Sequence, residues 1–110
     1  MHEMIFEAHV EARQHLTIER RAIWPVQFNA LLIQTVEDFD LYGLTVGDRE
    51  QLVNPRLPAV AFRSTDGIRL LLDRVGMGTR IALRVHNLAV SGRCFNARLQ
   101  MLPGLDTERP

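Results

Sequence analysis

The feature that most constrains the fold is a strict alternation of apolar and polar residues in two segments near the carboxyl terminus. In segment 80–86 the apolar residues alternate with arginine and histidine, and in segment 94–101 with cysteine, asparagine, arginine and glutamine. A period of two is typical of a β-strand with one buried face. The polar connection 87–92 ends in glycine, so the sequence predicts that the two segments are antiparallel strands of one hairpin, residues 79–101.

The outward face of this hairpin is the candidate binding site. Its proposed binding residues are Arg80, Arg84, His86, Arg98 and Gln100. The fold-back would bring Arg84 close to Arg98, and like charges opposite each other on a sheet are unfavourable unless something neutralises them. Three sources of neutralising charge remain as alternatives: solvent with its salt, acidic groups of this chain or of a second copy, and the phosphates of a nucleic acid. No aromatic residue is interleaved on this face as a stacking platform, which counts against nucleic acid.

The amino-terminal third shows a weaker form of the same pattern. Residues 4–12 alternate, which favours a strand, although their glutamates and alanines are good helix formers. The alternation resumes at Leu16 and Ile18 after a turn, so residues 3–23 are expected to form a hairpin, with a helix as the alternative. The apolar run Val26–Val36 predicts a central strand, with a buried helix of the same length as the alternative.

Two short helices are expected between these strands. The first covers residues 45–53, with a threonine cap and acidic residues in its first turns, and the second covers 64–75, with a glycine after its end. The apolar run 57–62 has a proline near its start, which favours a strand at a sheet edge. The sequence therefore predicts an α+β fold, with a mainly antiparallel sheet of about four to six strands and about two short helices.

Composition indicates one globular domain. A chain of 110 residues of which 46% are hydrophobic can bury a single core. We expect that domain to cover residues 1–102 and to be followed by a loose polar tail, 103–110. No run approaches the roughly 18 apolar residues of a membrane span, and the amino terminus lacks the pattern of a signal peptide. A single cysteine forms no internal disulfide, which favours the cytoplasm.

The charges are segregated along the chain. All 13 basic residues are arginines and the net charge is zero, yet residues 1–50 hold four arginines against nine acidic residues, and residues 51–110 hold nine against four. Guanidinium groups form forked hydrogen bonds with carboxylates. We therefore expect the acidic half to pair with the arginine-rich hairpin, within one chain or between two copies.

The chain carries no motif that identifies a catalytic site, and we expect no catalytic residue, metal or cofactor. Glu7, His9 and Glu11 lie along one strand and do not converge on a point, which favours a solvated polar face over a metal site. Cys94 is expected to pack against the fold rather than to act as a nucleophile with His86 as its base.

The aromatic residues Trp24, Phe28 and Phe62 are expected in the core, and any of them left exposed would mark an interface. The leading hypothesis is a small non-enzymatic cytoplasmic binding protein, a regulator or adaptor. It would act through contacts with a protein partner and self-associate, for example as a homodimer. Two alternatives stay open: a structural component of a larger assembly such as a phage particle, and a nucleic-acid-binding module that uses the same arginines.

Overall fold

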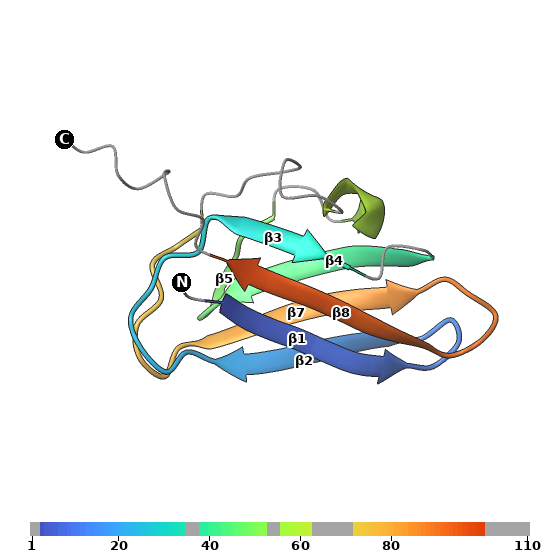
Figure 1. Cartoon of the computed structure of the whole chain (residues 1–110), viewed down its shortest axis with the longest axis horizontal. Coiled ribbons are helices and arrows are strands. Elements are labelled where there is room, and N and C mark those ends of the chain that lie inside the picture. The colour runs from blue at the N-terminus through green and yellow to red at the C-terminus, as the bar shows by residue number, and fades with distance from the viewer. Residues whose placement is uncertain (1–2, 35–37, 53–55, 63–71, 101–110) are drawn as a thin grey trace.

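A computed structural model describes residues 3–34, 38–52, 56–62 and 72–100, which fold into two antiparallel sheets packed face to face (Figure 1). The strands are β1 (Glu3–Val10), β2 (His15–Arg21), β3 (Ala30–Ile33), β4 (Phe39–Val46), β5 (Arg49–Glu50), β6 (Leu57–Pro58), β7 (Arg80–Asn87) and β8 (Arg93–Gln100), and a 3-10 helix, η1 (Ala59–Phe62), follows β6. The first sheet has the strand order β1-β8-β3. The second has the order β2-β7-β4-β5, with β6 paired to β4. This arrangement is a β-sandwich, in which each sheet buries one face against the other.

The strands pair differently from the prediction. The chain reverses at both expected turns, but β1 pairs with β8 and β2 pairs with β7, so each reversal crosses from one sheet to the other. The expected hairpins over 3–23 and 79–101 are therefore wrong, although their segments are strands. Alternation defines which face of a strand is buried and leaves its hydrogen-bonding neighbour undefined.

The alternating apolar residues face the core, as predicted for both segments. The inward residues of β7 and β8 are fully buried: Ile81, Leu83, Val85, Phe95, Ala97 and Leu99. Phe39 of β4 meets Phe95 edge to face between the sheets, with ring centroids 5.1 Å apart. Burying one side chain of this size contributes about 1.5–3 kcal/mol, so the facing strands stabilise the sandwich through side chains rather than through a shared ladder.

Asn87 joins the two reversals at one end of the sandwich. Its side chain is fully buried, and Nδ2 donates to the carbonyl oxygens of Val10 and Ser91, each at 3.0 Å. Oδ1 accepts from the amide of Ala89 at 2.9 Å, and the backbone amide of Asn87 donates to the carbonyl oxygen of Gln14 at 3.0 Å. One amide side chain thus links the β1–β2 loop with the β7–β8 loop.

The α+β prediction is wrong, because the described residues contain no α-helix. The described part of segment 45–53 instead completes β4, turns through Gly47 and continues as β5. Gly47 has a φ of 62° at the first position of a two-residue loop, a conformation that glycine adopts readily, and this turn outweighs the helix-cap pattern. Most of segment 64–75 lies outside the described residues; its end is extended, and Val75 pairs with Val26.

Two further expectations concern the strand over Val26–Val36 and the carboxy-terminal tail. The central strand expected over Val26–Val36 is reduced to β3, which lies at the edge of its sheet, beside β8. The expected tail, 103–110, lies outside the described residues.

One long side of the sandwich, which we call the closed side, is formed by β3 and β4 and is covered. The helix η1 packs against both strands, and its Phe62 is fully buried (Figure 1). The outer edge of β4 is paired in addition with β5 and β6. The closed side therefore leaves little of the β4 edge unpaired.

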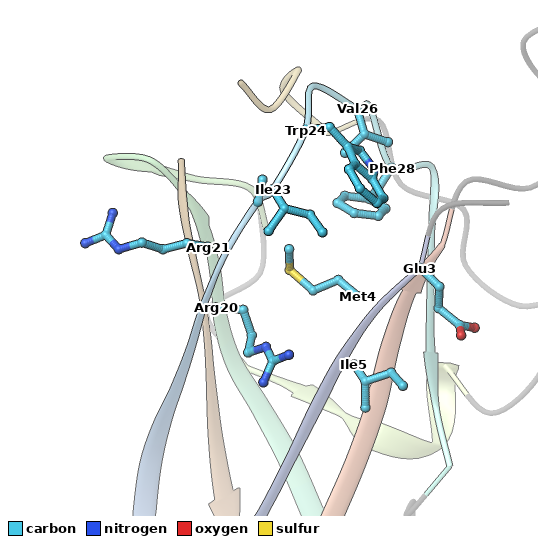
Figure 2. A pocket seen from close by; sticks show the side chains of 10 residues that line it. Glu3, Met4, Ile5, Arg20, Arg21, Ile23, Trp24, Val26 and Phe28 are labelled. Atoms are coloured by element: carbon cyan, nitrogen blue, oxygen red, sulfur yellow. The ribbon is translucent and has the colours of Figure 1, made fainter. Parts of the chain in front are cut away.

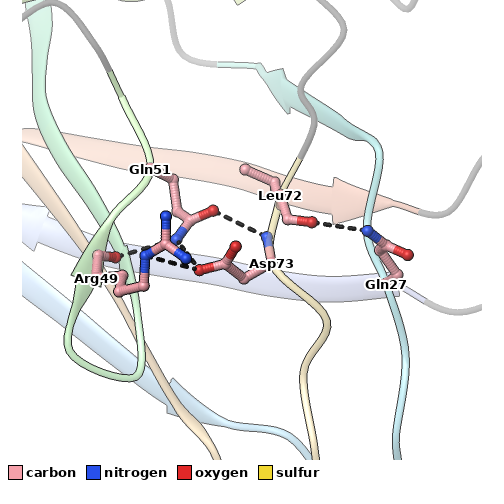
Figure 3. Close-up of polar contacts among 5 residues, drawn as sticks. All are labelled: Gln27, Arg49, Gln51, Leu72 and Asp73. Carbon is pink, nitrogen blue, oxygen red and sulfur yellow. Dashed lines mark hydrogen bonds and ion pairs between the residues drawn. The ribbon is translucent and has the colours of Figure 1, made fainter.

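A polar network holds the segment before β7 in place (Figure 3). The Asp73 amide donates to Gln51 Oε1 at 2.9 Å, and Gln51 Nε2 donates to Asp73 Oδ2 at 3.0 Å. Arg49 lies 3.4 Å from the same carboxylate, and Gln27 Nε2 donates to the Leu72 carbonyl oxygen at 2.8 Å. These contacts fix the segment between β5 and the loop that precedes β3.

Candidate binding groove

The opposite long side, which we call the open side, is formed by β1 and β2. Each is the last strand of its sheet, and neither is covered by another element in the described part of the chain (Figure 1). Three of their inward residues, Met4, Ala8 and Leu16, pack against the core yet stay only partly buried. The core is thus incompletely covered between these two edges.

A groove of about 330 Å³ opens at the end of this side where β1 begins and β2 ends. It is lined by Glu3, Met4, Ile5, Arg20, Arg21, Ala22, Ile23, Trp24, Val26 and Phe28. Figure 2 shows Ile23 and Met4 pointing toward each other across the groove, with Arg20 entering from β2. Seven of the ten lining residues are apolar, and the other three are charged.

The loop after β2 presents the most exposed apolar side chains of the groove. The Ala22 amide donates to the Thr79 carbonyl oxygen at 3.0 Å, and Val26 exchanges two backbone hydrogen bonds with Val75 at 2.8 and 2.9 Å. Between these anchors Ile23 is 68% exposed. Trp24, on the same loop, is 48% exposed. A loop held at both ends loses little conformational entropy when these side chains meet a partner.

The charged side chains of the groove differ in whether they already have a partner within the chain. The Glu3 carboxylate is already neutralised within the chain: Arg98 lies 3.4 Å from its Oε2, which also accepts a hydrogen bond from Gln100 at 3.0 Å. Arg21 donates to the Gly78 carbonyl oxygen and points away from the groove (Figure 2). The exposed Arg20 has no ion pair within the described ranges, so the groove carries an uncompensated positive charge.

The structure divides the five predicted binding residues between the two outer faces. Arg80, Arg84 and His86 lie on β7 in the second sheet, whereas Arg98 and Gln100 lie on β8 in the first. Because the inward faces of both sheets form the core, Arg84 and Arg98 point to opposite sides of the sandwich. Gln100 is buried, and its amide is already bonded to Glu3.

The expected pairing between the two halves of the chain occurs within one molecule. Four ion pairs each join an arginine after residue 50 to an acidic residue before it: Arg56–Asp40 at 2.6 Å, Arg80–Glu19 at 2.8 Å, Arg93–Asp38 at 3.6 Å and Arg98–Glu3 at 3.4 Å. The hydrogen bond to Asp40, together with the charge of that carboxylate, raises the pKa of Arg56. Charges that are segregated in sequence are thus mixed in space.

A second polar cluster lies on the outer face of the second sheet. The rings of His15 and His86 are stacked with centroids 3.9 Å apart, and Tyr42 meets both edge to face. Arg84 lies beside them and donates to the Tyr42 carbonyl oxygen at 3.3 Å. An aromatic residue does therefore accompany the arginines of this face, contrary to the expectation from sequence.

Sequence reasoning identified Trp24 as an interface marker if exposed but missed Arg20 and Ile23. A signal for Arg20 was present, because Leu16, Ile18 and Arg20 occupy successive inward positions of β2 and only the last is charged. A charge at an inward position indicates that the core stops there. The exposure of Ile23 depends on the contact between Val26 and Val75, which leaves no local pattern.

The structure also locates the residues that the sequence analysis considered as a nucleophile or as metal ligands. Cys94 is exposed on the outer face of the first sheet, so the expectation that it packs against the fold is wrong, and His86 lies in the other sheet. His9 lies 3.5 Å from Glu11, but no group of three metal-ligating side chains occurs within the described part of the chain. No helix found there is long and apolar enough to cross a bilayer.

Comparison of the chain with protein-family models, curated proteins and solved structures finds no match. The class that the fold and the groove define is a small two-sheet β-sandwich with one open side.

Proposed function

We propose that this protein is a protein-binding domain, a regulator or adaptor acting in the cytoplasm, and that the groove on the open side is its binding site. The single observation that supports this proposal most is the exposure of Trp24 and Ile23 on a loop anchored at both ends. Tryptophan is enriched among the residues that dominate binding energy at protein interfaces. Exposed apolar residues that adjoin one another and are rimmed by charge mark interaction sites.

The outer edges of β1 and β2, with which no other strand of the described residues pairs, support the same function. Edge strands present rows of free backbone donors and acceptors, which proteins use to add a strand from a partner. The four internal ion pairs weaken the alternative that two copies associate through acidic and arginine-rich surfaces, because those charges already have partners. A partner that fits the groove is therefore favoured over salt-dependent self-association.

Partner capture with paired variants tests this function. Immobilised wild-type protein and the variants Trp24→Ala and Val90→Ala would be incubated with a lysate of the source organism, and the retained proteins identified and titrated in purified form. Val90 is 81% exposed at the other end of the sandwich and serves as the control. We expect wild type and Val90→Ala to bind the purified partner equally and Trp24→Ala to bind at least about tenfold more weakly. Equal binding by all three would contradict the proposal.

The ring cluster on the second sheet favours one further candidate function, binding of single-stranded nucleic acid. Tyr42 and His86 could stack on bases while Arg84 contacts phosphate. Fluorescence anisotropy with labelled single-stranded DNA and RNA at two salt concentrations tests this candidate. Salt-dependent binding that Tyr42→Ala and Arg84→Glu both weaken would support it, and binding that neither variant changes would exclude this face.

A further inference from the structure

We infer that the partner enters the open side as an extended segment that adds to β2 as a new strand, with apolar side chains in the groove and a carboxylate against Arg20. This inference rests on the proposed function and names the chemistry of the occupant. Three features of the described residues support it: the free hydrogen-bonding edge of β2, the incomplete cover of the core, and the charge of the groove.

The register of β2 shows which backbone groups are free. Backbone hydrogen bonds join Gln14 to Asn87 and Ala22 to Thr79, just beyond the two ends of the β2–β7 ladder. Hydrogen-bonded positions alternate along an antiparallel pair, so the even-numbered residues of β2 face β7. Thr17 and Glu19 therefore direct their amides and carbonyls to the open edge, where an added strand would bond.

The side-chain alternation of β2 defines the pattern of the added strand. Neighbouring strands point their side chains to the same face at opposite positions, so residues opposite Leu16 and Ile18 would face inward. There they would cover the partly buried Leu16, Met4 and Ala8. The residue opposite Arg20 would also face inward, beside the groove. We thus expect two apolar residues and one acidic residue at alternate positions of the segment.

Charge distinguishes β2 from the other open edge. β1 carries Glu7 on its outward face and Glu11 follows it, and in the described residues neither carboxylate is paired with an arginine, so an acidic segment is repelled there. On β2, Glu19 is paired with Arg80 at 2.8 Å. The uncompensated guanidinium of Arg20 remains, and a carboxylate is the group that its forked donors match. An acidic segment therefore favours β2.

Selection from a displayed library of random decapeptides tests the inference. The library would be selected against wild type, Arg20→Glu and, as a control with the same charge change, Arg13→Glu, which precedes β2. We expect peptides selected by wild type and Arg13→Glu to carry Asp or Glu two or four positions from a β-branched or aromatic residue. Against Arg20→Glu we expect the acidic preference to disappear and the acidic peptides to bind about tenfold or more weakly, which corresponds to about 1.4 kcal/mol.

Amide hydrogen exchange of the wild-type protein with a selected peptide supplies the structural readout. We expect the amides of Thr17 and Glu19 to exchange at least about tenfold more slowly in the complex, because an added strand accepts their hydrogen bonds. Peptides that need Trp24 but protect neither amide, or that show no acidic preference, overturn the inference and leave the proposed function intact. A library that yields no Trp24-dependent peptide overturns the inference alone, since partner capture judges the function separately.

A second copy of the chain is the competing occupant. If the protein alone forms oligomers that Arg20→Glu dissolves, as measured by light scattering, the groove binds another copy and the inference is overturned. A monomer at every salt concentration, together with the peptide preference, supports it.

Discussion

The closed and open sides of the sandwich differ in how the edges of the two sheets and the core between them are covered. On the closed side, η1 covers the gap between β3 and β4 with a fully buried phenylalanine, and two short strands pair with β4. On the open side, β1 and β2 have no such cover in the described residues, and charged residues alternate along their outward faces. Charges on edge strands oppose unspecific pairing between chains. The difference indicates that the closed side serves stability, whereas the open side stays available for a partner.

The largest effect is expected on the closed side. Phe62→Ala should lower the free energy of unfolding by about 3–5 kcal/mol, because it leaves a cavity where η1 meets both sheets. Chemical denaturation measures this change, with Val90→Ala as a control that should stay within about 0.5 kcal/mol of wild type. A loss below about 1 kcal/mol would show that η1 does not seal this side.

The next effect concerns the end of the sandwich at which Asn87 links the β1–β2 loop with the β7–β8 loop. Asn87→Ala removes a buried amide and leaves the carbonyl oxygens of Val10 and Ser91 and the amide of Ala89 without that partner. We expect a loss of about 2–4 kcal/mol in the free energy of unfolding. Asn87→Asp, which keeps the acceptor but places a carboxylate against the carbonyl oxygens of Val10, Glu11 and Ser91, should be no more stable than Asn87→Ala. A stability equal to wild type for either variant would contradict this role.

Strands β7 and β8, with Asn87 between them, show how much of the fold could be predicted from sequence. Alternation correctly predicted which residues of β7 and β8 are buried, because the side-chain period is a local property of a strand. The pairing could not be predicted in the same way. It depends on long-range contacts such as the hydrogen bonds of the Asn87 side chain to the carbonyl oxygens of Val10 and Glu11. These residues lie 77 and 76 positions from Asn87 in the chain, so no local pattern records the contacts. A reversal between two amphipathic strands is compatible with a hairpin and with a crossing between sheets.

The candidate site shows the same limit. The expected arginine face required β7 and β8 to pair, so it separated once they lay in different sheets. Trp24 was recognisable as an interface residue only on condition that it is exposed. That condition depends on the bridge between Val26 and Val75, which are 49 positions apart in the numbering of the chain. Residue chemistry was therefore readable from the sequence, whereas the grouping of those residues was not.

A pair of proline substitutions tests the free edge of β2 and sharpens the comparison. The amide of Thr17 faces the open edge, whereas that of Arg20 faces β7, by the register given above. Proline at position 20 removes a ladder hydrogen bond, and proline at position 17 removes none. Arg20→Pro should therefore lower the free energy of unfolding by about 1–3 kcal/mol more than Thr17→Pro. Equal losses would mean that the open edge is not free at Thr17.

The smallest effect on stability is expected within the groove itself. Trp24→Ala should change the free energy of unfolding by less than about 1 kcal/mol, because about half of the side chain is already in contact with solvent. Phe28, which lines the same groove but is buried, is the matched comparison, and Phe28→Ala should lower the free energy of unfolding by about 3 kcal/mol or more. Thermal and chemical denaturation of both variants separate a residue that holds the fold from one that is presented to a partner. If Trp24→Ala destabilised the protein as much as Phe28→Ala does, Trp24 would belong to the core, and the distinction between the closed and the open side would fail at the groove.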